Sequence, residues 1–107
     1  MNTDSVVCRK VSVPRKASDP ALQPGDFAWD FDAPECGGNR ANTTHYIYLS
    51  LPGDGGGWSA IQVQRGAPGG PRIWGWDGNE DVPTLTPSIL VPGQWHGYLK
   101  NGRLQSC

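Results

Sequence analysis

The dipeptide Asn101-Gly102 restricts the fold of this chain more than any other feature of its sequence. An Asn-Gly pair between alternating apolar residues is the strongest short-range indication of a two-residue β-hairpin, because both turn residues must adopt positive φ. Such a turn also fixes the pairing of the two strands. His96 is then expected opposite Cys107, with the two Cβ atoms about 4.5–5.5 Å apart.

The remainder of the sequence indicates an all-β fold. Glycine and proline supply 15 and 10 of the 107 residues, and they separate short runs of aromatic and β-branched residues. No segment combines helical periodicity with capping residues. We predict one small antiparallel sheet or sandwich over residues 26–107, preceded by an extended arm over residues 1–25. The expected strands cover residues 27–31, 45–51, 58–64, 72–76 and 88–91, together with the hairpin 95–107, and the segments 45–51 and 58–64 are expected to pair.

Charge and hydropathy restrict the cellular setting. The formal net charge of −1 provides no general attraction to nucleic acid or to an anionic membrane. The chain contains neither eighteen consecutive apolar residues nor a secretory signal pattern, so we expect a cytoplasmic protein without a membrane span. Lasting disulfides are uncommon in that compartment, which favours thiols or metal ligands for the three cysteines.

A zinc site is one hypothesis for these residues. Structural zinc is held by four Cys or His side chains, and the expected hairpin brings two of them together. Plain thiols, a disulfide and a histidine at the end of an edge strand are the alternatives. The proposed ligands are Cys36, His45, His96 and Cys107, with Cys8 as the alternative to His45.

Two polar segments are candidates for partner binding. The first is an acidic turn and the second is a group of cations in the N-terminal arm, although such segments are more often a solvated turn and a solvated arm. The carboxylates of the turn would also suit acid–base chemistry with His96, but nothing in the sequence fixes that geometry. The candidate partner-binding residues are Asp77, Asn79, Glu80, Asp81, Arg9, Lys10, Arg15 and Lys16.

The C-terminal third resembles a family of small uncharacterised phage and prophage proteins. The resemblance is carried by Trp74-Gly75-Trp76-Asp77-Gly78, by Pro83-Thr84-Leu85-Thr86-Pro87-Ser88-Ile89, and by Trp95-His96-Gly97-Tyr98-Leu99 followed by Gly102. Further upstream, Ala33-Pro34-Glu35-Cys36-Gly37 is similar to the family's Cys-Pro-x-Cys-Gly knuckle, with Ala33 in place of the first cysteine. The resemblance implies a phage setting and a metal site.

These observations favour a small phage or prophage accessory protein that acts by binding a host or phage protein without catalysis. A zinc-stabilised inhibitor of a host defence system is the specific form of this hypothesis. Three other classes remain open: a zinc-dependent hydrolase, a nucleic-acid binder that uses the basic arm, and a virion component. None of them has a catalytic or binding constellation that the sequence alone makes specific.

Overall fold

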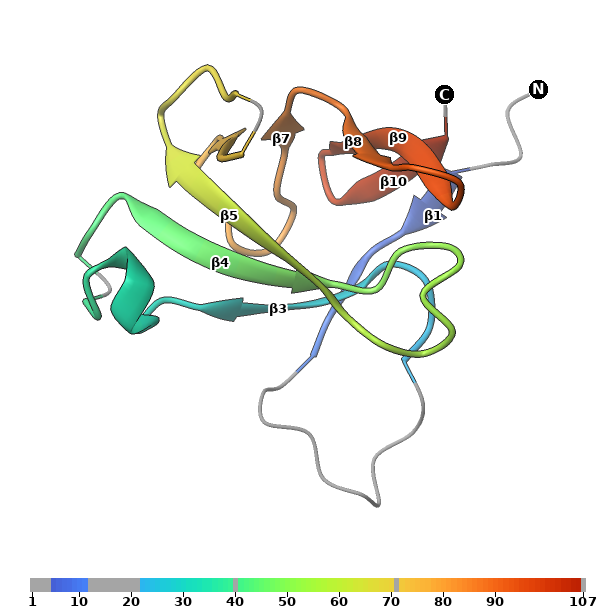
Figure 1. The fold of residues 1–107 in the computed structure, drawn as a ribbon, viewed down its shortest axis with the longest axis horizontal. Coiled ribbons are helices and arrows are strands. Elements are labelled where there is room, and N and C mark those ends of the chain that lie inside the picture. Colours follow the sequence, from blue (N-terminus) through green and yellow to red (C-terminus); the bar gives the residue numbers. More distant parts are fainter. Residues whose placement is uncertain (1–4, 12–21, 40, 71, 107) are drawn as a thin grey trace.

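The computed structural model describes residues 5–11, 22–39, 41–70 and 72–106, and these residues form two β-sheets (Figure 1). The predicted all-β class is confirmed, since the described helical structure is one 3₁₀ turn, η1 (Pro34–Cys36). The described part of the chain contains no helix of the length and apolar character that crossing a lipid bilayer requires.

Sheet A is antiparallel and contains four strands in the order β1-β10-β9-β8. The β9–β10 hairpin has the predicted register, with Leu104 opposite Leu99. Its turn residues Asn101 and Gly102 have φ values of 50° and 71°, as a two-residue turn of this type requires. The strands of sheet A are β1 (Ser5–Val7), β8 (Ile89–Val91), β9 (Trp95–Lys100) and β10 (Arg103–Ser106).

Sheet B contains six strands in the order β2-β3-β4-β5-β6-β7, and the predicted pairing of the segments 45–51 and 58–64 is observed as β4 with β5. The sheet is mixed rather than antiparallel throughout, because β2 runs parallel to β3 and β5 runs parallel to β6. Side chains alternate in the same way in parallel and antiparallel strands, so the sequence pattern did not distinguish the two kinds of pairing. The strands are β2 (Arg9–Lys10), β3 (Asp26–Asp30), β4 (Thr44–Leu49), β5 (Ser59–Arg65), β6 (Trp74–Trp76) and β7 (Leu85–Thr86).

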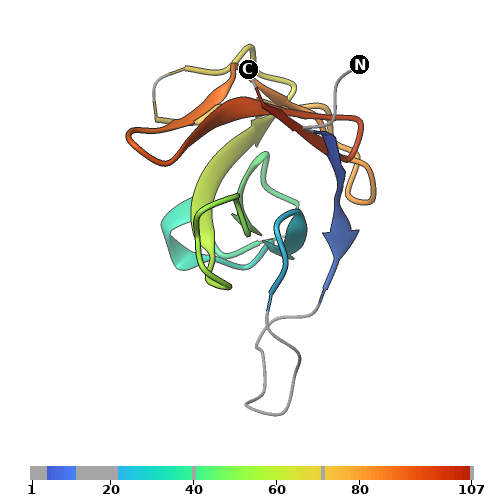
Figure 2. The same ribbon diagram turned by 90° about the vertical axis from the view of Figure 1, so that its right-hand side faces the viewer.

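The core lies between the two sheets. Figure 2 shows the β9–β10 hairpin crossing above the strands of sheet B. Strands with one buried face alternate apolar and polar side chains, and β9 follows this rule along its whole length. Both sheets contribute to one buried cluster, which consists of Phe27, Ile47, Leu49, Leu51, Ile61, Val63, Trp76, Leu85, Ile89, Trp95, Leu99 and Leu104.

The predicted N-terminal arm contributes two strands to the described structure. β1 pairs with β10 in sheet A, and β2 pairs with β3 in sheet B. Arg9 also donates two hydrogen bonds to the buried carboxylate of Asp26, at 3.1 and 2.8 Å. Residues 12–21, which include Arg15 and Lys16, lie outside the described residues. The division of the chain at residue 25 therefore stays a prediction.

His45 is the one histidine of this chain that lies in the core. Its side chain is 1% exposed, and the edges of its ring meet the aromatic rings of Phe31 and Trp76 at centroid distances of 4.9 and 6.2 Å. Neither ring nitrogen has a hydrogen-bond partner among the described residues. A buried polar group without a partner lowers stability, because it loses its hydrogen bonds to water on folding.

We expect His45→Phe to raise the free energy of unfolding by about 1 kcal/mol, since the aromatic contacts are kept and the unpaired nitrogens are removed. Equilibrium unfolding in urea measures this change. The same replacement at the exposed His96 should give no stabilisation. A marked fall in stability for His45→Phe would contradict this account and would favour the metal-ligand interpretation of His45.

The tip of the β9–β10 hairpin packs against the segment before β7. Gly102 donates its N–H to the carbonyl of Pro83 at 2.9 Å and accepts the N–H of Cys8 at 2.8 Å. A methyl group on Gly102 would lie 3.0–3.1 Å from atoms of Val82. The glycine is therefore required both by its positive φ and by the close approach of Val82.

Gly102→Ala should lower the free energy of unfolding by about 2–4 kcal/mol, because backbone strain and overpacking act together. Gly93→Ala is the matched control, since Gly93 also has positive φ (75°) but its methyl group would meet no atom within 4 Å. It should cost about 1–2 kcal/mol from strain alone. Equal losses in the two variants, measured by thermal unfolding, would show that the Val82 contact contributes nothing.

Candidate active site

A serine and a histidine form a hydrogen-bonded pair on sheet A. Ser88 Oγ lies 2.9 Å from His96 Nε2. Ser88 immediately precedes β8, and His96 lies in β9 opposite Leu90. Residues two apart on a strand share a face, so Ser88 lies on the same face as the exposed Leu90. Because Leu90 is directly opposite His96, Ser88 is a diagonal neighbour of His96 on that face.

The backbone of Ser88 is held from the other sheet. Trp74, in β6, donates its indole N–H to the carbonyl oxygen of Ser88 at 3.2 Å. Two residues earlier, the Thr86 hydroxyl donates to the carbonyl of Pro68 at 3.2 Å, and Gly69 packs so closely against the Thr86 carbonyl that a side chain there would overlap it. The segment that leads into Ser88 is thus fixed on both sides before β8 begins.

His96 is oriented by its two neighbours in β9. Trp95 faces the core, and its indole N–H donates to Ser106 Oγ at 2.9 Å. The Trp95 ring covers Gly97, where any Cβ would overlap both the ring and the carbonyl of Gln105. Because successive side chains alternate between faces, fixing residues 95 and 97 inward turns His96 outward.

This arrangement has the geometry of an activated nucleophile. A serine hydroxyl is a weak nucleophile until a base within hydrogen-bond distance accepts its proton, and a neutral imidazole nitrogen at 2.9 Å meets that condition. In the described part of the chain no carboxylate is hydrogen-bonded to His96, so the observed unit is a Ser–His pair. Such a pair can attack the carbonyl carbon of an ester or amide.

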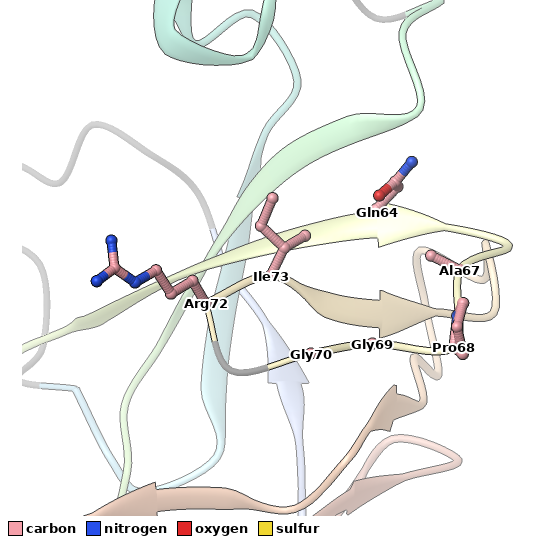
Figure 3. A pocket seen from close by; sticks show the side chains of 7 residues that line it. All are labelled: Gln64, Ala67, Pro68, Gly69, Gly70, Arg72 and Ile73. Carbon is pink, nitrogen blue, oxygen red and sulfur yellow. The ribbon is translucent and has the colours of Figure 1, made fainter.

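Two hollows flank the segment before Ser88 without including the pair. The larger, of 380 Å³, is formed by the loop after β5 and is lined by Ala67, Pro68, Gly69 and Gly70 together with Gln64, Arg72 and Ile73 (Figure 3). The smaller, of 250 Å³, includes Trp76, Thr84 and Thr86. Neither of these two hollows is lined by Ser88 or His96.

The predicted zinc ligands lie in different surroundings. His45 is in the core, and Cys36 accepts a hydrogen bond at its sulfur from Gln62 Nε2 at 3.4 Å. Burial raises the pKa of the Cys8 thiol to about 11, which disfavours the thiolate that zinc binds. Cys107 lies outside the described residues. Among the residues that are described, no three His, Cys, Asp or Glu side chains form a metal-binding group.

Zinc bound by His96 and Cys107 stays a prediction. The hairpin register continues as expected as far as Ser106 opposite Gly97, one position before that pair. Binding of a metal at His96 Nε2 would compete with the hydrogen bond to Ser88. Elemental analysis of the tag-free protein beside Cys107→Ser tests the prediction directly.

The acidic turn 77–81 is held together by its own hydrogen bonds. Asp77 accepts the backbone N–H groups of Asn79 and Thr84, and the Asn79 side chain accepts the N–H groups of residues 81 and 82. Asp81 forms an exposed ion pair with Lys10 at 3.2 Å. One cation of the predicted arm, Lys10, therefore contacts the turn. Their role in partner binding stays a prediction.

Ser88 is a candidate site residue that reasoning from the sequence missed. The sequence suggests carboxylates as partners of His96, whereas the structure places this serine beside it. A signal was available, because Pro92-Gly93 predicts a turn between residues 88–91 and the hairpin 95–107. An antiparallel pairing across that turn brings Ser88 and His96 to one face of the sheet.

A protein-family model matches the region of the chain that contains this pair. Residues 38–107, well over half of the chain, match the model of a family described as bacterial ubiquitination-like system serine protease (BubE). The matched range includes Ser88, His96 and Trp74. No curated protein and no solved structure matches the chain. The match does not bear on the phage setting, which stays a prediction.

Trp74→Phe should slow the reaction of Ser88 with a fluorophosphonate probe by about tenfold, because the Ser88 carbonyl loses its donor while the apolar packing is largely kept. The second-order labelling rate, followed by mass spectrometry of the modified serine, measures the effect. Trp29→Phe is the matched control, since the Trp29 indole donates in the same way to the Glu80 carbonyl at 2.9 Å. An equal decrease of the labelling rate in both variants would show that Trp74 only stabilises the fold and does not position Ser88.

Proposed function

The chain belongs to the family of bacterial ubiquitination-like system serine proteases, and we propose that it is a hydrolase of such a system with Ser88 as nucleophile and His96 as general base. The observation that carries the proposal is the 2.9 Å contact between Ser88 Oγ and His96 Nε2 inside the matched region. The bond cleaved is an amide that joins or lies within proteins of that system.

The proposed reaction proceeds through an acyl-enzyme. Ser88 Oγ attacks the carbonyl carbon while its proton moves to His96 Nε2, which gives a tetrahedral intermediate. Collapse of this intermediate breaks the carbon–nitrogen bond, and His96 donates the proton to the departing amine. A water molecule then attacks the acyl ester while its proton moves to His96. Collapse of the second tetrahedral intermediate breaks the bond between the acyl carbon and Ser88 Oγ, and His96 returns the proton to Oγ as the acid is released.

The open position of the pair favours a protein substrate. Ser88 and His96 lie on the outer face of a four-stranded sheet, and neither lines the two described hollows. A small molecule bound there would remain largely solvated, whereas a protein can cover the face and exclude water from it. This departs from the non-enzymatic binding protein favoured by the sequence, although both accounts require a protein partner. An inhibitory role toward a host defence system stays a prediction.

Ser88→Ala should abolish fluorophosphonate labelling and lower the rate of p-nitrophenyl acetate hydrolysis at least about 10³-fold, because the nucleophile is removed. His96→Gln should lower both rates by a similar factor, since the glutamine side chain cannot act as the base. A time course of fluorophosphonate labelling and the rate of p-nitrophenolate release measure these effects.

Ser5→Ala is the matched control, because Ser5 is an exposed serine in sheet A that accepts a hydrogen bond from Arg103 at 3.4 Å. It should retain the full rates. Labelling at another residue, or unchanged rates in Ser88→Ala, would reject the proposed nucleophile.

A further inference from the structure

The outer face of sheet A is arranged in rows around Ser88 and His96. Strand register places Leu90 opposite His96, and continuing the same register by one residue places Ser88 opposite Tyr98. Tyr98 is itself opposite Gln105, which pairs with Ser5. The last row contains Lys100, Arg103 and Val7. A substrate segment that lies across this face with a carbonyl at Ser88 therefore passes close to Leu90 and Tyr98.

This face collects exposed apolar side chains. Leu90 is 59% exposed, Tyr98 is 49% exposed and Val7 is 64% exposed. Among the described residues, one further large apolar side chain is exposed to this degree, Val82 at 48%, and it lies at the tip of the β9–β10 hairpin. An exposed apolar patch around a nucleophile is typical of a surface that binds another protein.

The face also carries charge of one sign. Lys100 and Arg103 are exposed and lie opposite each other, and the four strands of sheet A contain no Asp or Glu. The carboxylates of the described residues all lie outside these strands. A partner with acidic side chains is attracted to such a face, and one with basic side chains is repelled.

We propose that the outer face of sheet A binds a segment of the protein substrate that presents apolar and acidic side chains on the same side, at every second residue, and that this binding delivers the scissile carbonyl to Ser88. The inference rests on the proposed function and adds the chemistry of the substrate. The apolar side chains of the segment would contact Leu90 and Tyr98, which flank the catalytic pair. Its carboxylates would lie near Lys100 and Arg103, about 7 Å further along the hairpin.

The test uses two fluorescein-labelled peptides of equal length, one of Leu-Ser-Glu-Ser repeats and the other of Leu-Ser-Lys-Ser repeats, so that leucine and the charged residue lie on the same side of an extended peptide. Fluorescence anisotropy with the full-length protein should show at least about tenfold tighter binding of the glutamate peptide at low salt. Lys100→Glu combined with Arg103→Glu should reverse this preference. Raising the salt concentration to about 1 M should weaken the charge-dependent difference, because the screening length falls to about 3 Å.

Apolar contact is tested separately. Leu90→Ser and Tyr98→Ser should each weaken binding of the glutamate peptide by about tenfold, because a large apolar contact is lost. Val82→Ser is the matched control, since it removes a similarly exposed apolar side chain away from the catalytic pair. It should leave the affinity unchanged.

The peptide-binding measurement and the ester-hydrolysis measurement test the docking surface and the nucleophile separately. Equal affinities for the two peptides, or a preference that the charge reversal does not alter, would overturn the inference even if Ser88→Ala abolishes ester hydrolysis. Selective binding of the glutamate peptide together with unchanged ester hydrolysis in Ser88→Ala would retain the docking surface and reject the proposed nucleophile.

Discussion

The alternation of β9 between core and solvent is the constraint on which the rest of the structure depends. Trp95 and Leu99 face the core beside the close-packed Gly97, while His96, Tyr98 and Lys100 face outward. A shift of one residue would place a histidine and a lysine in the core, so burial enforces this register strongly. One face of β9 therefore packs in the core between the two sheets, and the other face carries His96 beside Ser88.

The candidate nucleophile depends on a contact between the two sheets. Ser88 leads into sheet A, yet its carbonyl accepts a hydrogen bond from Trp74 of sheet B. On the other side, the hydrogen bond of Thr86 to Pro68 holds the preceding backbone. A serine placed on a freely moving loop would meet the imidazole only part of the time, whereas these contacts keep it within 2.9 Å. Packing of the two sheets thus also fixes the position of Ser88 beside His96.

Polar residues of the same type in this protein differ in their hydrogen-bond partners and burial. The acidic turn 77–81 satisfies its own backbone groups, and the buried Asp26 is paired with Arg9. In the described part of the chain neither ring nitrogen of His45 has a hydrogen-bond partner, and its aromatic surroundings offer none, an arrangement that lowers stability. His96 is exposed and bonded to a serine. Residue type alone therefore does not separate a histidine of the core from one at the proposed catalytic pair.

The sequence by itself determined the features that depend on near neighbours along the chain. Asn101-Gly102 specified the β9–β10 turn and its register, and alternating residues predicted β4, β5 and their pairing. Only the tertiary structure decided the parallel pairs, the burial of His45 and the support of Ser88 by Trp74. Turn chemistry and alternation act over a few residues, and they are visible as patterns. Contacts between separate sheets arise from the joint packing of the core, which no local pattern encodes.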